Sequence, residues 1–495
     1  MTHLNRRQFL SLSAGSTGAA VFAQCSNHQG RTQNPQSLPS SYQSQEGLLE
    51  VDLTASNSPL NLAGQPTSPF SYNQQIPGPR LEANPGDTIR IHFHNQLPQP
   101  TNLHYHGLHI PPTGTADNVF LSVPPQETFT YEFTLPENHP AGTFWYHPHR
   151  HGYVADQVFA GLAGLFIVRG ELDQIPEIQA AQEAFCVLQD FQLTGNGFPH
   201  QAIMMGREGD TILINGQTNP TFSLPRQGLL RLRLLNASTS RFYRLSLDNH
   251  PFYLLATDGG ALAKPQELTE LLLTPGERAE LLIHGNQDPR AYSLRNLPYN
   301  RGGMGMMGGG MMGGGMMSDR RRGRRGRRGQ GNTNNTPQVL ATLRYSEAET
   351  ALAVPQRLLA VETLPEPQRV RQFELNHGMM RGQGMIFLIN GQPYQGERID
   401  TTVSLNTVED WEITNTGVMD HPFHLHVNPF QVISRNGQPE PIRAWKDTVL
   451  IPRGETVRVR IPFRDFTGKT VYHCHILDHE DLGMMGNLEI RPSAV

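Results

Sequence analysis

Cysteine, charge and long apolar runs are all scarce in this chain. Only three cysteines occur among 495 residues, which excludes a fold held together by a disulfide framework. Charged residues make up 17% of the sequence, and no convincing long amphipathic helix is visible. In contrast, 48 glycines and 38 prolines favour many short strands joined by turns. A chain of this length is long enough for about three domains of ordinary size.

The N-terminus has no apolar stretch long enough to cross a membrane. Arg6 and Arg7 precede a short, weakly apolar segment rich in serine and glycine. We interpret residues 1–25 as a removable export signal of the twin-arginine type, and we expect a periplasmic or extracellular protein. The alternative is a disordered tail with a chance arginine pair. Cys25 would accept a lipid only if the signal were cut just before it, and Gln24 is a poor residue for that site.

Positive charge is concentrated in one tract. Seven arginines lie between Arg320 and Arg328, and removing them from the formal net charge of −4 leaves an acidic remainder of −11. The tract resembles arginine- and glycine-rich segments that bind nucleic acids. Export argues against that role, so we expect a solvated loop near an anionic surface and no nucleic-acid partner.

The stretch from Val471 to Met485, VYHCHILDHEDLGMM, gathers potential metal ligands. If Val471 to Ile476 form a strand, His473 and His475 point to one face and Cys474 points to the other. On that other face, Cys474 can meet His479 and Met484 from the following loop. A thiolate, an imidazole and a thioether are the ligands of a mononuclear copper site that transfers electrons. One strand is therefore predicted to serve two metal sites.

Three more histidine pairs have the same spacing. They are His104 and His106, His147 and His149, and His424 and His426, so that with His473 and His475 eight imidazoles lie on strand faces. His421 precedes His424 by three residues, which turns it to the opposite face, where it can join Cys474. A single pair of this kind is more often two ordinary strand histidines near a surface. Four pairs with a cysteine inside the last one predict a metal centre.

The histidine pairs belong to an internal repeat. His104 and His106 follow Asn95 by nine and eleven residues, and His424 and His426 follow Asn415 by the same offsets. A middle copy ends at Asn236, where these offsets fall on Leu245 and Leu247. Gly142 precedes His147 by five residues, as Gly468 precedes His473. The pattern predicts three copies of one antiparallel β-sandwich, of which the first and third bind metal.

These segments resemble the copper signatures of the three-domain multicopper oxidases, the family of laccases and bacterial copper efflux oxidases. The resemblance covers nearly the whole chain after residue 45. It implies an all-β fold of three cupredoxin-like Greek-key β-sandwich domains. We expect domain 1 at residues 46–170, domain 2 at 171–347 without copper ligands, and domain 3 at 368–495 with a type 1 copper. Residues 26–45 and 348–367 are expected to be linkers, and residues 301–335 a Met/Gly/Arg-rich insertion in domain 2.

The resemblance also implies four copper ions and their ligands. The type 1 copper would take His421, Cys474, His479 and Met484; the type 2 copper would take His104 and His424; the type 3 pair would take His106, His147 and His475 on one ion and His149, His426 and His473 on the other. By resemblance, Asp117 and Glu480 are candidate proton relays, although either could be an ordinary loop acid. Asp447 could orient a ligating imidazole.

The remaining notable side chains have simpler interpretations. Because the paired motifs come from domains 1 and 3, the copper cluster is expected between them, and domain 2 is expected to act mainly as a spacer. Structural roles are expected for His92, His94, His200, His250 and His284, and Cys186 is expected to be a buried core thiol. His109 and His151 lie beside ligand segments and could support them.

A second unusual segment runs from Gly302 to Met317 and holds seven methionines among glycines. They are Met304, Met306, Met307, Met311, Met312, Met316 and Met317. So much glycine disfavours a helix or strand, and thioethers favour cuprous ions. We hypothesise that this loop gathers Cu(I) near the type 1 copper, with Met379, Met380, Met385 and Met419 as nearer docking points. The alternative is an insertion whose composition has drifted.

The resulting functional expectation is an oxidase. It would couple one-electron oxidation of Cu(I) or of phenolic and aromatic donors to the four-electron reduction of dioxygen to water, as a monomer without a transmembrane segment. Met484 as axial ligand suggests a moderate type 1 potential. The alternatives are a laccase with a purely organic donor, a non-enzymatic exported relative that serves cell division, and a copper buffer. The non-enzymatic alternative requires missing ligands, and a copper nitrite reductase is disfavoured by the three-domain length.

Overall fold

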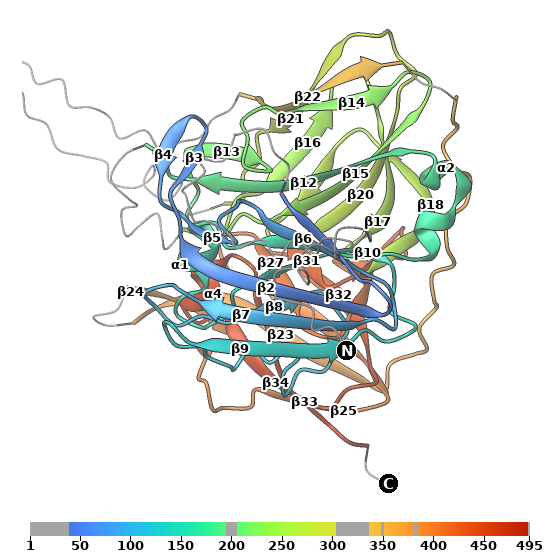
Figure 1. Ribbon diagram of the computed structural model, residues 1–495. Coiled ribbons are helices and arrows are strands. Elements are labelled where there is room, and N and C mark those ends of the chain that lie inside the picture. The colour runs from blue at the N-terminus through green and yellow to red at the C-terminus, as the bar shows by residue number, and fades with distance from the viewer. Residues whose placement is uncertain (1–38, 195–204, 303–335, 348–350, 381–383, 494–495) are drawn as a thin grey trace, which may run out of the picture. The chain divides into compact units, whose positions relative to one another are not determined.

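The computed structural model describes residues 39–194, 205–302, 336–347, 351–380 and 384–493. The predicted export signal, Cys25, His200, the methionines from Met304 to Met317 and the arginine tract lie outside the described residues. Figure 1 shows domain 2 in green and yellow above the blue strands of domain 1 and the orange and red strands of domain 3. Among the described residues, no helix has the length and apolar character needed to cross a membrane.

Domain 1 consists of two sheets around one core. Its elements are β1 (Ser41–Gln43), β2 (Leu48–Asn57), β3 (Leu60–Leu62), β4 (Gln65–Thr67), β5 (Phe70–Tyr72), β6 (Gly78–Ala83), β7 (Thr88–Asn95), β8 (His104–His106), β9 (Thr128–Thr134), β10 (Gly142–His147), α1 (Val154–Phe159) and β11 (Gly164–Val168). The sheets have the orders β1-β6-β11-β10-β8 and β5-β2-β7-β9, and β3 and β4 form a hairpin. Strand β1 falls within the range expected to be a linker, where it pairs with β6.

Domain 2 repeats this arrangement. Its elements are η1 (Glu171–Gln174), α2 (Pro176–Gln179), β12 (Gln182–Phe191), β13 (Thr211–Ile214), β14 (Thr221–Pro225), β15 (Leu229–Asn236), β16 (Tyr243–Leu247), β17 (Phe252–Thr257), β18 (Gly260–Leu268), β19 (Leu271–Leu273), β20 (Arg278–His284), β21 (Ala291–Leu297) and β22 (Gln338–Ser346). The sheet orders are β13-β12-β15-β20-β17-β18 and β14-β22-β21-β16-β19. Cys186 is fully buried in the core of this domain, as predicted.

Domain 3 is the third sandwich. Its elements are β23 (Arg369–Met380), β24 (Gly384–Ile389), β25 (Thr401–Ser404), β26 (Thr407–Asn415), β27 (His421–Leu425), β28 (Phe430–Arg435), β29 (Gln438–Pro439), β30 (Trp445–Lys446), β31 (Thr448–Ile451), β32 (Thr456–Phe463), β33 (Gly468–Cys474), α4 (Leu477–Asp481) and β34 (Met485–Arg491). The sheet orders are β24-β23-β26-β32-β28-β29, with β30 beside β28, and β25-β34-β33-β27-β31.

The sandwiches are mixed rather than purely antiparallel, which corrects the sequence expectation. Strand β2 runs parallel to β7, β12 to β15, and β23 to β26. The opposite sheets also contain parallel pairs, β6 with β11, β14 with β22, and β25 with β34. Alternation along a strand predicts which side chains are buried but not which strand lies next to it. The same departure in all three domains indicates one shared topology.

Three buried asparagines make the repeat visible in atomic detail. Asn95, Asn236 and Asn415 end β7, β15 and β26, and each side-chain amide donates to two backbone carbonyls. Each side-chain oxygen accepts the N–H of the residue two positions later, which is an Asx turn. The turn sets the start of the segment that reaches β8, β16 and β27. Histidines in domains 1 and 3 therefore occupy the place of Leu245 and Leu247 in domain 2.

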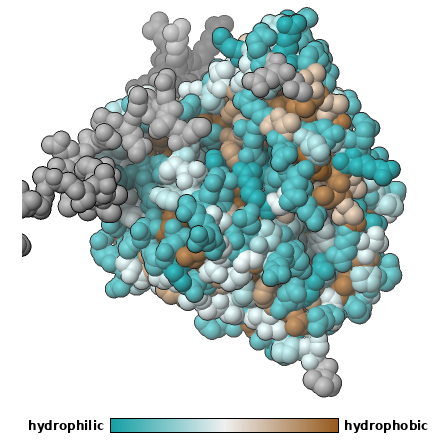
Figure 2. Space-filling view, turned by 45° about the vertical axis from the view of Figure 1, so that its right-hand side comes forward, coloured by the Kyte–Doolittle hydropathy of each residue, from teal (hydrophilic) through white to brown (hydrophobic). Residues whose placement is uncertain are grey.

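Domains 1 and 3 present their histidines through equivalent strand pairs. In domain 1, β8 pairs with β10 so that His104 lies opposite His147. In domain 3, β27 pairs with β33 so that His424 lies opposite His473. All eight paired histidines are buried. Elsewhere the face in Figure 2 is largely hydrophilic with scattered apolar residues, and few large apolar side chains are exposed among the described residues.

Candidate metal centre

The first metal site lies inside domain 3 around Cys474, at the end of β33. The Cys474 sulfur lies 3.4 Å from His421 Nδ1 and 3.8 Å from His479 Nδ1, and these two nitrogens are 3.3 Å apart. Strand β27 supplies His421 and helix α4 supplies His479. All three side chains are fully buried. The opposite facing of His421 and His424 predicted by their spacing therefore brings His421 to the cysteine.

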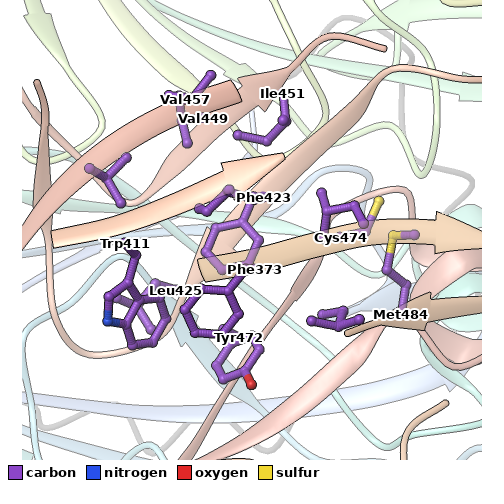
Figure 3. Close-up of a cluster of buried hydrophobic side chains, with 14 of the residues drawn as sticks. Phe373, Trp411, Phe423, Leu425, Val449, Ile451, Val457, Tyr472, Cys474 and Met484 are labelled. Atoms are coloured by element: carbon purple, nitrogen blue, oxygen red, sulfur yellow. The ribbon is translucent and has the colours of Figure 1, made fainter. Parts of the chain in front are cut away.

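Met484 completes this group. Its side chain is fully buried, and the Cys474 backbone N–H donates to the Met484 carbonyl at 3.0 Å. Figure 3 shows the two sulfur atoms at one edge of the apolar core that contains Phe423, Trp411 and Tyr472. The Ile476 N–H points to the Cys474 sulfur at 3.4 Å. Sulfur, two imidazoles and a thioether in an apolar pocket are the ligand set expected for a mononuclear copper site.

Residues that sequence reasoning missed surround the Cys474 site. The Phe387 ring stacks on His479 with centroids 3.8 Å apart, and Met205 of domain 2 packs against the domain 3 core. Arg301 donates to the carbonyls of Gly206 and Ser240 within domain 2, and its own carbonyl accepts from the Asp420 N–H of domain 3. Burial raises the pKa of the Cys474 thiol, and burial, with His377 and Arg301, lowers the pKa of His421 to about 3. A neutral imidazole is the form that binds metal.

The second region is an imidazole cluster between domains 1 and 3. His104 stacks on His426 with ring centroids 3.9 Å apart, and His106 stacks on His424 at 3.8 Å. Each histidine of β8 thus lies against a histidine in β27 or directly after it. Burial, together with the neighbouring imidazoles, holds the pKa of His104 well below its ordinary value. Eight imidazoles therefore share a buried space.

One of the predicted type 3 sets converges closely. His473 Nε2 lies 3.1 Å from His149 Nε2 and 3.0 Å from His426 Nε2. Nitrogens about 3 Å apart can all lie near 2 Å from one ion, as expected for imidazole ligands. The three rings come from the segment after β10, from the residue that follows β27 and from β33. They form a group able to hold a metal ion.

By ring centroids, the other predicted sets are slightly more open than the first, whose centroids lie 4.7 to 5.2 Å apart. The rings of His106, His147 and His475 have centroids 4.9 to 5.7 Å apart. The predicted type 2 ligands His104 and His424 have centroids 5.9 Å apart. The structure brings all eight predicted histidines together, and none is turned away to the surface.

Several cluster histidines keep one ring nitrogen free to bind copper. Their Nδ1 atoms donate outward, His104 to Asp117, His147 to the Pro148 carbonyl, His424 to the Asp447 carbonyl and His473 to the Cys474 carbonyl. The Nε2 atoms of His104, His147 and His424 then have no hydrogen-bond partner among the described residues. A buried polar atom without a partner costs free energy, and metal ligation would remove that cost.

The pKa values of two carboxyl groups at the cluster are shifted in opposite directions. Asp117 accepts from the Tyr105 backbone N–H at 2.9 Å and from His104, and burial raises its pKa to about 8. Glu480 lies 3.1 Å from His473 Nδ1 and 3.6 Å from His149 Nε2. Burial alone would raise the pKa of Glu480, but these two imidazoles lower it to about 2. The cluster therefore has a protonated carboxyl on one side and a carboxylate on the other at neutral pH.

The third predicted carboxylate, Asp447, contacts two ligand rings. Its Oδ1 accepts from His106 Nε2 at 3.0 Å, and its backbone carbonyl accepts from His424 Nδ1 at 2.8 Å. His109 also bridges domains, since its Nδ1 donates to the Val427 carbonyl, whereas His92 and His94 are partly exposed beside Glu50 and Asp52. His250 bonds the Tyr345 hydroxyl within domain 2.

The predicted docking methionines differ in exposure. Met379 is 76% exposed on β23, whereas Met385 and Met419 are only 2% and 1% exposed in the domain 3 core. Met385 and Met419 are therefore buried away from solvent in this conformation, because β24 and the segment before β27 turn their side chains inward. A role of these residues in docking Cu(I) stays a prediction.

Multicopper oxidase family models match three segments of the chain, residues 54–173, 189–308 and 364–494. Each segment falls on one of the three sandwiches. The chain belongs to the multicopper oxidase family, and its sandwiches are cupredoxin-like, which confirms both predictions made from the sequence. Membership implies copper binding and oxidoreductase activity.

Individual relatives cover most of the chain. It is 29% identical over 432 residues to multicopper oxidase mco of Staphylococcus haemolyticus, covering 85% of this chain and 83% of that protein. It is 30% identical over 505 residues to cell division protein FtsP of Xenorhabdus nematophila, covering 99% of each. The solved structure of a multicopper oxidase from Campylobacter jejuni, titled a metallo-oxidase, matches with a TM-score of 0.77 at 30% identity over 92% of this chain and 97% of that one.

Proposed function

We propose that this protein is an exported oxidase with four copper ions that couples one-electron oxidation of Cu(I) or of phenolic and aromatic donors to reduction of dioxygen to water. One observation carries the proposal. Cys474 lies in the mononuclear site, while its sequence neighbours His473 and His475 lie in the imidazole cluster on the other side of the same chain segment. Two sites joined by adjacent residues suit a device that passes electrons from one to the other.

The proposed ligands are those suggested by the resemblance. Cys474, His421, His479 and Met484 would hold type 1 copper, and the eight paired histidines would hold the type 2 and type 3 ions. Copper, when bound, would supply a one-electron acceptor at the cysteine, and the four ions together would supply the four electrons that reduce dioxygen at the cluster. The protein buries both sites and provides the short covalent path through the backbone of residues 473–475.

The proposed proton relays are Asp117 and Glu480. Reduction of dioxygen to water consumes four protons, and these carboxyl groups contact His104 on one side and His473 on the other. A pKa near 8 keeps a transferable proton on Asp117 at neutral pH, whereas Glu480 is ionised and can accept one. Proton delivery through both groups is a part of the proposal.

Cu(I) is the favoured donor because of where the methionine-rich segment joins the body. Gly302, the last described residue before that segment, forms a β-bridge with Met419, and Asp420 N–H donates to the Arg301 carbonyl at 2.8 Å. The segment is therefore attached two residues from the type 1 ligand His421. Thioethers are suitable ligands for cuprous ions, and Met379 offers one more on the surface.

Oxygen uptake by the copper-loaded protein tests the donor. We expect uptake with Cu(I) and with a phenol, and we expect deletion of Met304–Met317 to lower the Cu(I) rate while leaving phenol oxidation unchanged. Met379→Ser should have the same selectivity with a smaller effect. Deletion of the unrelated insertion residues 329–335 provides a control for the shortened loop. Equal losses with both donors would contradict a role in Cu(I) delivery and favour a laccase with an organic donor.

The non-enzymatic alternative is favoured by the similarity to cell division protein FtsP. That reading requires missing copper ligands, and the convergence of all eight imidazoles and of Cys474 argues against it. Copper analysis separates the two, because an intact oxidase should hold about four ions and a strong thiolate-to-copper absorption band. A chain that retains no copper would contradict the oxidase proposal.

Four further proposals follow from the sequence. Arg6 and Arg7 with the following apolar stretch support export, and the domain ranges 46–170, 171–347 and 368–495 remain our proposed division. We also propose that the protein works as a monomer. Dioxygen and a small reducing donor are the proposed partners.

A further inference from the structure

We propose that Arg278 of domain 2 is a positioning residue of the imidazole cluster. It fixes the orientation of the histidine rings through Asp447. The inference rests on the proposed function, because the cluster is taken to bind copper. It gives domain 2 a direct part in the metal centre instead of the spacer role expected from its lack of ligands.

Arg278 begins β20 and is buried, with all five guanidinium N–H groups used. Nη1 and Nη2 donate to the two carboxylate oxygens of Asp447 at 2.8 and 2.6 Å. The remaining donors reach backbone carbonyls, Nε to Thr143, Nη1 to Gly276 and Nη2 to Asp258, at 3.0 to 3.1 Å. These partners belong to all three domains. A planar fork with five donors meets this geometry, and a lysine ammonium with three cannot.

Asp447 transmits this constraint to the ligands. Its Oδ1 accepts from His106 Nε2 and its carbonyl accepts from His424 Nδ1, so one residue touches a ring from each half of the cluster. His106 therefore presents Nδ1 to the cluster, whereas His104, His147, His424 and His473 bond outward through Nδ1 and present Nε2. Outward partners of ligating histidines set ring orientation. The bidentate pair fixes that partner for His106.

Two glycines make room for this contact. Gly107 follows His106 with φ +88°, and a Cβ there would overlap Arg278 Nη2 and lie 2.6 Å from Asp447 Oδ2. Gly276 of domain 2 has φ +84°, and a Cβ there would lie 2.9 Å from the His475 ring. The backbones of domains 1 and 2 thus come within contact of the cluster without side chains between them.

Arg233 offers a matched control in the same domain. It lies on β15, which pairs with β20, and it is as deeply buried as Arg278. Its guanidinium bonds Glu183, Glu280 and Asp173 and touches Thr143, but none of these carboxylates contacts a cluster histidine. Substitution disrupts a buried arginine network at both positions, but only Arg278 of the two binds a carboxylate that contacts a cluster histidine.

The test compares copper retention in the full-length protein. Arg278→Lys should lose type 2 and type 3 copper to a chelator about 10 to 100 times more readily than wild type while keeping the type 1 absorption band. Arg233→Lys should lower the melting temperature without this selective loss. Copper content, the type 2 EPR signal and the melting temperature are measured together.

A second pair of variants leaves Arg278 in place. Gly107→Ala inserts a methyl group against the Arg278–Asp447 pair and should also release cluster copper selectively. Gly47→Ala has a similar φ of +82° with nothing within 4 Å of the new Cβ, so it controls for backbone strain alone.

The outcomes separate this inference from the proposed function. Retention of cluster copper by both Arg278→Lys and Gly107→Ala, or equal loss in Arg233→Lys, overturns the role of Arg278. A wild-type protein that holds copper but consumes no oxygen contradicts the proposed function and leaves the comparison of variants valid. A wild-type protein that retains no cluster copper overturns both.

Discussion

The Cys474 site and the imidazole cluster differ in how many domains they need. Every predicted ligand of the Cys474 site lies between His421 and Met484 in domain 3. The cluster takes half its rings from domain 1 and half from domain 3, and its outward hydrogen bonds extend to Arg278 of domain 2. The mononuclear site thus depends on the fold of one sandwich, whereas the cluster depends on how three sandwiches pack.

Their surroundings differ as well. The Cys474 site adjoins apolar side chains, including Phe423 and Ile476, in the core of domain 3. The cluster is bordered by the charged or titratable groups Asp117, Glu480 and Asp447. An apolar shell suits a site that exchanges only electrons, because little solvent must reorganise. Carboxyl groups suit a site where protons are also consumed.

The largest expected effect is the loss of the Cys474 site while the imidazole cluster keeps its copper. Cys474→Ser should abolish the thiolate-to-copper absorption band and oxygen uptake and remove one copper per chain, because a hydroxyl is a poor ligand for type 1 copper. The cluster should retain its copper. Burial of the serine hydroxyl should lower stability by roughly 1–3 kcal/mol.

Cys186→Ser provides the control for that stability loss. Cys186 is the other buried thiol among the described residues and lies in the core of domain 2. It should show a similar loss of stability with the absorption band and oxygen uptake intact. An unchanged band in Cys474→Ser would contradict the assignment of the mononuclear site.

A smaller effect should be confined to the cluster. Glu480→Gln and Asp117→Asn each remove a carboxyl beside the histidines, so oxygen uptake should fall about 10²- to 10⁴-fold, the usual contribution of a positioned acid or base. Reduction of the type 1 band by donor, followed in a stopped-flow experiment without oxygen, should keep its rate. Loss of that rate as well would mean that these residues support the whole fold and not proton delivery.

Glu409→Gln is the matched carboxylate control. Glu409 is buried in domain 3, but it pairs with Arg371 and the Trp411 indole N–H, away from both metal regions. Its substitution should lower stability without slowing oxygen reduction selectively.

The alternation of side chains along a strand was enough to predict that β33 contributes to two different sites. The opposite facing of Cys474 and its two histidine neighbours, and the turning of His421 away from His424, follow from the two-residue period of a strand. The offsets from Asn95 and Asn415 worked for a similar physical reason, since each buried asparagine fixes the same turn before the histidines. Local geometry therefore predicted which side chains share a face, and the family resemblance assigned them to copper ions.

Contacts between domains could not be predicted from local sequence spacing. Arg278 and Met205 reach the metal regions from domain 2, and Phe387 comes from a distant strand of domain 3. Arg278 and Glu280 were visible as charges inside an apolar strand segment, which indicates buried ion pairs but not their partners. Parallel pairing and the burial of Met419 were likewise set by neighbours far away in sequence. These features required the packed structure.

The smallest expected effect concerns the axial position of the Cys474 site. Met484→Leu replaces a fully buried thioether with a side chain of similar volume, so stability should change by less than about 1.5 kcal/mol. Loss of the axial sulfur should raise the type 1 reduction potential while leaving the absorption band and the cluster copper in place. Met485→Leu is the control, because Met485 is equally buried but packs against Val119 and Val471 instead of the Cys474 pocket. A potential that shifts in Met485→Leu and stays constant in Met484→Leu would show that Met484 is not the axial ligand.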